Sequence, residues 1–105
     1  MEELMKELIK FQSERDWKKF HTPENLAKSI SIEANELLEC FQWDEDHYDL
    51  SAVKDELADV LVYCIDMLDR LDLDADEIIN DKMSKNEIKY PVLKSKGNSI
   101  KYDKL

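Results

Sequence analysis

Two pairs of carboxylates stand three residues apart inside helical patterns that are otherwise apolar. Glu33 and Glu36 belong to the stretch SIEANELLEC, and Glu56 and Asp59 belong to KDELADVLVY. At about 100° per residue, Glu33 and Glu56 fall on the apolar side of their helices, where leucine would be expected. Each has its partner acid on the next turn of the same face. The same arrangement therefore occurs on two consecutive predicted helices.

These four acids predict a metal site. Two such faces packed together would oppose four anions, which is costly unless a cation neutralises them. Oxygen ligands suit hard ions, so we expect Mg²⁺, with Mn²⁺ or Ca²⁺ as alternatives. A ferritin-type di-iron site is not expected, because neither His21 nor His47 stands in a Glu-x-x-His motif, and no Cys-x-x-Cys suggests zinc. With 25 acids in 105 residues, one such pair alone could be solvated surface, and only its repetition favours the metal site.

The helices that carry these acids are marked by their start signals. The chain holds one Gly and two Pro, and no stretch alternates apolar and polar residues as a strand would. Thr22 before Pro23 is a typical helix start, Asp49 or Ser51 can cap the next helix, and Asp74 begins an Asp-x-x-Glu capping pattern. We therefore expect helices over residues 2–20, 23–42, 51–71 and 74–89.

Four helices with short connections predict an all-α, four-helix bundle-like fold, with residues 1–105 as a single domain. The basic tail, residues 91–105, is either a frayed end or a lid that closes over phosphates. A domain of this size buries a modest core, so we expect oligomerisation to contribute to its stability.

Charge and cysteine usage narrow the partners and the compartment. The formal net charge of −10 argues against nucleic acid and anionic membranes as partners. Cys40 and Cys64 lie in apolar helical runs, and we interpret them as buried free thiols. The N-terminal stretch lacks a signal-peptide core, and the apolar runs are too short to span a bilayer. We expect a cytoplasmic protein.

Several short motifs accompany the acidic pairs over nearly the whole chain. They are ERDW at 14–17, FH at 20–21, ELLECFQW at 36–43, DELADVLVY at 55–63, KMSKN at 82–86, YP at 90–91 and KGNSIKY at 96–102. In this combination the chain resembles the MazG-like, all-α nucleoside triphosphate pyrophosphohydrolases, and within them the dCTP pyrophosphatase type.

The resemblance implies that Glu33, Glu36, Glu56 and Asp59 bind Mg²⁺. It implies hydrolysis of dCTP or a modified dCTP between the α and β phosphates, which gives a monophosphate and pyrophosphate and cleans the nucleotide pool. It also implies a homodimer, or a homotetramer built from dimers, with sites near subunit contacts. The substrate-binding residues that it implies are Trp17 and Trp43 at the base, together with His21, Lys82, Asn86, Tyr90, Lys96, Lys101 and Tyr102.

Several alternatives stay open. Glu33 or Glu36 could orient the attacking water, and Glu39 is a third candidate, although it lies about 120° from Glu33 around the helix. The chain departs from the family pattern at about Leu8, where close relatives carry His, and in a shorter loop after residue 42. The base preference is therefore open, and a dUTPase-like hydrolase of the same all-α group is an alternative. A non-catalytic helical oligomerisation or adaptor module, with its acids as solvated surface, is another.

Overall fold

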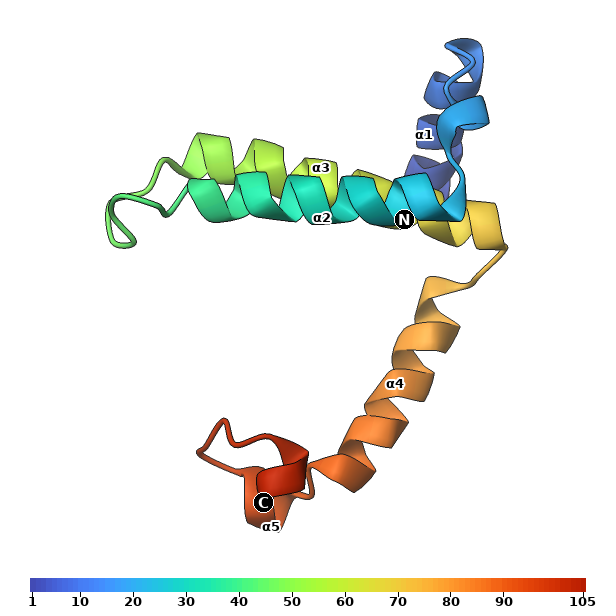
Figure 1. Cartoon of the computed structure of the whole chain (residues 1–105). Helices are drawn as coiled ribbons and strands as arrows, with labels where there is room; N and C mark the ends of the chain where they lie inside the picture. Colours follow the sequence, from blue (N-terminus) through green and yellow to red (C-terminus); the bar gives the residue numbers. More distant parts are fainter. The chain divides into compact units, whose positions relative to one another are not determined.

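The computed structural model describes all 105 residues as five α-helices and two 3₁₀-helices, with no strand (Figure 1). The predicted all-α class is confirmed. The chain divides into two compact units, Met1–Asp72 and Leu73–Leu105, and each is described by itself. The single domain over residues 1–105 stays a prediction. None of the helices combines the length and apolar character that crossing a membrane requires.

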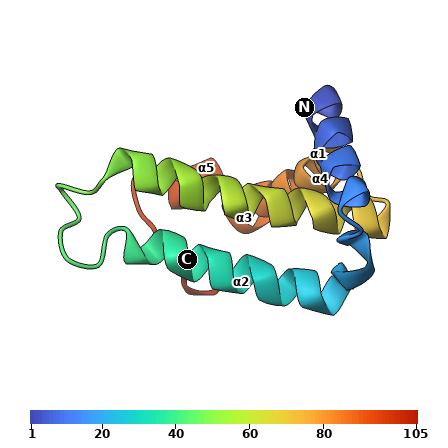
Figure 2. The same cartoon turned by 90° about the horizontal axis from the view of Figure 1, so that it is seen from above.

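Two long helices, α2 (Pro23–Glu39) and α3 (Leu50–Leu71), form the body of the first unit. They run side by side in opposite directions in both ribbon views (Figures 1 and 2). The helix α2 ends three residues before the predicted residue 42, because Cys40, Phe41 and Gln42 continue it only as a turn. The antiparallel pair brings the acidic faces of α2 and α3 opposite each other.

Both long helices begin where their capping residues predict. The Oγ1 atom of Thr22 accepts a hydrogen bond from the backbone N–H of Asn25 at 3.2 Å, with Pro23 at the first helical position. The Oδ1 atom of Asp49 accepts from the backbone N–H of Ser51 at 3.0 Å. Of the two predicted caps of α3, Asp49 is therefore the one used.

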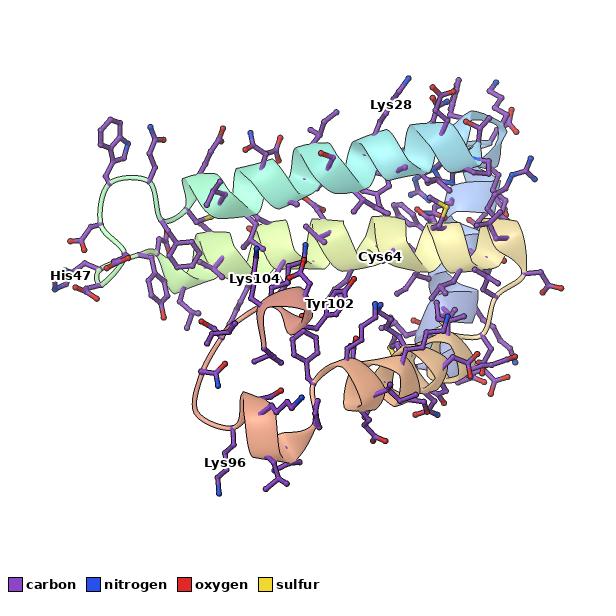
Figure 3. All side chains as sticks on the ribbon, turned by 60° about the horizontal axis from the view of Figure 1, so that its bottom comes forward. Lys28, His47, Cys64, Lys96, Tyr102 and Lys104 are labelled. Carbon is purple, nitrogen blue, oxygen red and sulfur yellow. The ribbon has the colours of Figure 1, made fainter.

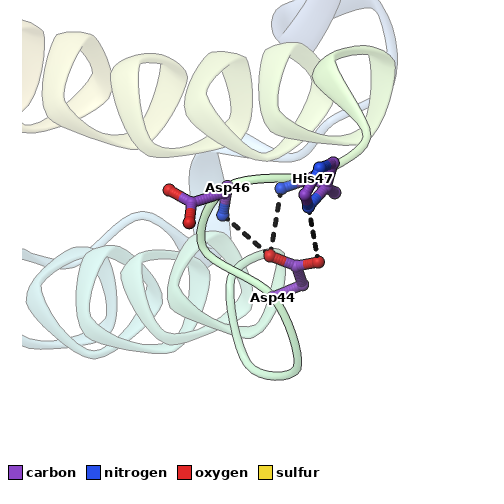
Figure 4. A network of polar contacts seen from close by, with 3 residues as sticks. All are labelled: Asp44, Asp46 and His47. Carbon is purple, nitrogen blue, oxygen red and sulfur yellow. Dashed lines mark hydrogen bonds and ion pairs between the residues drawn. The ribbon is translucent and has the colours of Figure 1, made fainter.

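The loop between α2 and α3 is organised around one carboxylate (Figure 4). Asp44 Oδ1 accepts from the backbone N–H groups of Asp46 and His47 at 2.9 and 3.2 Å, and its Oδ2 lies 2.7 Å from Nδ1 of His47. These contacts, the backbone N–H of Asp46 foremost, hold the pKa of Asp44 below its usual range. The rings of Phe41 and Tyr48 meet across the base of the loop, with centroids 4.8 Å apart.

The predicted first helix over residues 2–20 is wrong in its length. The helix α1 covers only Glu2–Glu14, and a separate 3₁₀-helix follows at Lys18–Phe20. Between them Asp16 adopts a left-handed backbone with φ of +56°, a conformation that Asp tolerates better than most residues. The freed N–H of Trp17 bonds the carbonyl of Gln12 at 3.0 Å, which turns the chain sharply. The helix α1 runs across the end of the α2–α3 pair and contacts α3 (Figures 1 and 2).

The second unit contains α4 (Ala75–Lys89), α5 (Val92–Ser95) and a 3₁₀-helix at Tyr102–Lys104. The predicted cap is present, since Asp74 Oδ2 accepts from the backbone N–H of Glu77 at 3.2 Å. The helix α4 ends at Lys89, as the following Pro91 predicts. No residue of this unit is fully buried.

Candidate active site

The four predicted carboxylates come together. Glu33 and Glu36 project from α2 and Glu56 and Asp59 from α3, and each offers one oxygen atom such that all four lie within 4.8 Å of one another. The i, i+3 spacing aligns each pair on one helix face, and the antiparallel packing of α2 on α3 opposes the two faces. The sequence thus predicted a cluster whose members come from two separate helices.

The cluster is electrostatically strained. Burial raises the pKa of Glu33 from 4.5 to about 7, and the adjacent Glu36 carboxyl group and the charges of Glu36, Asp59 and Glu56 raise it further. The pKa of Glu56 is also raised, first by the adjoining Glu36 carboxyl group and then by burial. The Oε2 atoms of Glu33 and Glu56 are buried and have no hydrogen-bond partner. Two buried carboxyl oxygens without a hydrogen-bond partner are a costly arrangement for the protein alone.

These observations fit a hard divalent cation. Four carboxylate oxygens, two of them buried without partners, form the all-oxygen donor set that Mg²⁺ and Mn²⁺ prefer. No lysine or arginine forms an ion pair with any of the four acids. A cation bound between the two helices would supply the positive charge that these side chains lack.

A cavity of about 440 Å³ lies in the same unit, where the segment after α1 meets α2 and α3. Its lining is aromatic and polar, as is typical of pockets that bind small molecules. The lining residues are Trp17, Phe20, His21, Asn25, Leu26, Ser29 and Tyr63. Two predicted substrate-binding residues, Trp17 and His21, therefore share one pocket.

Tyr63 connects this pocket to the carboxylates. It lines the cavity, and it follows Asp59 by one helical turn on α3. Burial raises the pKa of the Tyr63 hydroxyl, and the nearby charges of Glu33 and Asp59 raise it further. The phenol therefore stays protonated, with its ring toward the pocket and the acids close by.

Trp43 and Glu39 lie apart from this centre. Trp43 is 89% exposed, in the loop beyond the far end of α2, and it does not line the pocket of Trp17. Glu39 is the last residue of α2 and is not among the four clustered acids; it borders a shallow depression with Leu38 and Phe41. The catalytic role of Glu39 stays a prediction.

The remaining predicted residues belong to the second unit. Lys82, Asn86 and Tyr90 lie on α4 or at its end. The ring of Tyr90 meets that of Tyr102 edge-on, with centroids 6.1 Å apart, and Nζ of Lys89 lies 4.7 Å from the centroid of Tyr102. Figure 3 shows Lys96 extending from the end of α5, and Tyr102 and Lys104 in the segment that follows.

No ion pair forms within the second unit, although it contains seven lysines: Lys82, Lys85, Lys89, Lys94, Lys96, Lys101 and Lys104. Their charges are therefore available to an anionic ligand. The substrate contacts expected of this unit stay predictions.

Sequence reasoning did not single out Asn25, Ser29 and Tyr63 as pocket residues. A signal existed for Tyr63, because it stands four residues after Asp59 and shares its helix face. In the sequence, Asn25 is an ordinary residue near a helix start and Ser29 an ordinary polar residue of a helix. Only the packing of the segment after α1 places them at a cavity.

Comparison with known proteins adds an independent finding. The model of the MazG-like family matches residues 28–105, which span both structural units. The chain belongs to the MazG-like family. This confirms the family that the motifs resemble.

Individual relatives agree with this membership. The chain is 34% identical to dCTP pyrophosphatase 1 of Mus musculus and 32% to that of Homo sapiens, each alignment covering 100% of this chain and 67% of the relative. It is 44% identical to a pyrophosphatase from Archaeoglobus fulgidus, whose crystal structure superposes with a TM-score of 0.80 over 87% of this chain and 92% of that one. The predicted enzyme class, a pyrophosphohydrolase, is confirmed, and the adaptor alternative is not supported.

Proposed function

We propose that this MazG-like enzyme hydrolyses dCTP or a modified dCTP, in the presence of Mg²⁺, to the nucleoside monophosphate and pyrophosphate. One observation carries the proposal: four carboxylates converge beside an aromatic pocket. Tyr63 connects the two, because it lines the pocket and lies close enough to Glu33 and Asp59 for their charges to raise its pKa. A nucleoside triphosphate matches this arrangement, because its base can occupy the aromatic pocket while its phosphates bind a cation held by the four acids. Such an activity would remove unwanted nucleotides from the cellular pool.

In this proposal Glu33, Glu36, Glu56 and Asp59 hold Mg²⁺, and Mn²⁺ would fit the same oxygens. The cation would polarise phosphoryl oxygens and neutralise charge on the triphosphate. Glu33 or Glu36 would orient the attacking water and accept its proton. Glu39 remains the third candidate.

The pocket is proposed to hold the base and sugar. Trp17 offers an aromatic face on which any base can stack, so it contributes affinity with little selectivity. Asn25, Ser29 and His21 supply the hydrogen-bonding groups that could tell cytosine from other bases. The relatives named dCTP pyrophosphatase 1 support cytosine as the preferred base.

Trp43 is proposed to complete the site from a second copy of the chain. Trp17 precedes α2 and Trp43 follows it, and the 17 residues of α2 put about 25 Å between them. One nucleotide base cannot stack on both within a single chain. Exposed apolar side chains on the long helices, such as Ile32 and Leu61, would be covered in a homodimer or a homotetramer built from dimers.

Subunit mixing tests the shared site. Trp17→Ala and Trp43→Ala variants would each lose affinity, whereas mixed and reassembled oligomers would regain part of it in sites that combine the two intact tryptophans. If the mixed oligomers bind the nucleotide no better than the two separate variants do, a site built from two copies is contradicted.

The lysines of the second unit are proposed to contact the phosphates, with Lys82 and Asn86 on α4 and Lys96 and Lys101 in the tail. Their charge is not neutralised by ion pairs within the unit. Tyr90 and Tyr102 would stabilise the tail through their edge-to-face contact. The tail would then order over the triphosphate as a lid.

Product analysis on a panel of dNTPs and NTPs tests the proposal. We expect monophosphate and pyrophosphate from dCTP, suppression by a chelator, and recovery on adding Mg²⁺. Preference for dUTP would instead identify a dUTPase-like member of the all-α group. Release of inorganic phosphate alone, or no turnover of any nucleotide by the folded protein, would refute the proposed reaction.

A further inference from the structure

A polar pair is buried where α1 meets α3. Gln12 is 4% exposed and Asp66 is 3% exposed, and Nε2 of Gln12 donates to Oδ2 of Asp66 at 2.9 Å. Only two other residues, Leu26 and Ile65, are buried. Burying a carboxylate in so small a core is costly, and packed apolar residues would serve stability at least as well. The mechanism proposed above does not use either residue.

Each member of the pair is connected to a residue that lines the pocket. The carbonyl oxygen of Gln12 accepts the backbone N–H of Trp17 at 3.0 Å, so the residue that binds Asp66 also holds the turn that presents Trp17. Asp66 follows Tyr63 by three residues on the same face of α3. Two pocket residues from separate segments, Trp17 and Tyr63, are thus connected to one buried hydrogen bond.

Other contacts around the pair are weaker. The ring of Phe11 packs edge-on against Trp17, with centroids 5.6 Å apart. Nζ of Lys18 lies 3.3 Å from Oδ2 of Asp69, but this ion pair is partly exposed and contributes little. The buried bond between Gln12 and Asp66 is therefore the main polar link between α1 and α3, and the bond from the Trp17 N–H to the Gln12 carbonyl ties the segment after α1 to it.

We propose that Gln12 and Asp66 are positioning residues of the nucleotide pocket, whose buried hydrogen bond holds the segment of residues 15–21 against α3 so that Trp17 and His21 face Tyr63. The inference rests on the proposed function, because the pocket's role as the nucleotide site is itself proposed. Neither residue touches the substrate. They act through the side chains that do.

The protonation of Asp66 determines whether one or two hydrogen bonds can join it to Gln12. Burial raises the pKa of Asp66, while Gln12, His21 and Lys18 oppose the rise and Asp69 adds to it. The Oε1 atom of Gln12 is buried without a partner. A protonated Asp66 can donate to this oxygen while still accepting from Nε2, which makes a reciprocal pair. Asn at position 66 would reproduce that pair permanently.

The test compares two substitutions at Asp66. Asp66→Val removes the bond at similar size, and Asp66→Asn keeps it; Glu7→Gln, at an exposed site on α1, is the matched control. For Asp66→Val we expect the KM for dCTP to rise roughly ten- to hundredfold, with kcat nearly unchanged, because a displaced pocket wall weakens binding throughout the reaction. Asp66→Asn and Glu7→Gln should keep the KM of the unmodified chain.

Trp17 fluorescence supplies a readout that needs no turnover. In a Trp43→Phe background, Trp17 is the sole tryptophan, and Asp66→Val should shift its emission to longer wavelength as the ring becomes more exposed. If Asp66→Val does not fold, Gln12→Met removes the same bond and carries the same expectations.

Unchanged KM and unchanged Trp17 emission in a folded, active variant would overturn this inference alone. Lack of nucleotide turnover by the unmodified chain would instead overturn the proposed function.

Discussion

Replacing Glu33 by Gln should stabilise the protein when no divalent cation is present. In the folded chain the pKa of Glu33 is about 7, against 4.5 for an unperturbed Glu. Because the folded value lies above the unfolded one, ionisation of Glu33 costs folding free energy. This penalty is absent below about pH 4.5 and complete above about pH 7, so stability falls as the pH rises through that window.

The size of the effect follows from the same shift. One pKa unit corresponds to about 1.4 kcal/mol, so a rise from 4.5 to about 7 sets an upper limit of about 3 kcal/mol. Glu33 is half-buried and solvent screens part of the repulsion, so we expect about 1–2 kcal/mol. For a chain of this length that gain raises Tm by roughly 4–16 °C.

Thermal unfolding followed by circular dichroism measures this effect at pH 5 and pH 8 in a chelator. Glu33→Gln should raise Tm at pH 8 much more than at pH 5. Glu39→Gln, on the same helix but outside the cluster, should change little at either pH. Added Mg²⁺ should stabilise the unmodified chain and stabilise Glu33→Gln less. A Glu33→Gln variant that is less stable at pH 8 in chelator would refute the reasoning about the cluster.

Three further predictions concern other parts of the molecule. Trp17→Ala should raise the KM for dCTP roughly ten- to hundredfold through the loss of stacking, and Trp17→Phe should retain most of the affinity, as steady-state kinetics would show. Asp74→Ala removes the cap of α4 and should cost about 1 kcal/mol in urea unfolding. Because the pKa of Asp66 is raised above 3.8, its ionisation is unfavourable in the folded state, so Asp66→Asn should be more stable than the unmodified chain at pH 7 but not below pH 3.8, by thermal unfolding.

Features set by short stretches of sequence were predictable. Thr22 and Asp74 cap their helices as their local patterns indicate, because a cap needs only a side chain and the N–H two or three residues later. The four carboxylates could be assigned to helix faces from their spacing. Their meeting required one further assumption, that consecutive helices pack antiparallel.

Features that depend on distant contacts or on backbone conformation were not predictable in this way. The end of α1 depends on the left-handed backbone of Asp16, and the residues around it continue to favour a helix. The bond between Gln12 and Asp66 joins positions 54 residues apart, so no local pattern marks it. The pocket residue Asn25 is recognisable only once the segment after α1 has folded back toward α2.

The four-carboxylate cluster is tested most directly as the active site by measuring, with ³¹P NMR, how fast Glu36→Gln converts dCTP to dCMP and pyrophosphate with Mg²⁺ present. Glu36 belongs to the four-carboxylate cluster and influences the pKa of both Glu33 and Glu56. We predict that the folded variant loses at least about a hundredfold in rate, the typical contribution of one general acid–base group, while Glu39→Gln stays active enough to measure. Unchanged turnover by Glu36→Gln would show that the chemistry takes place elsewhere and would contradict the assignment of the cluster as the active site.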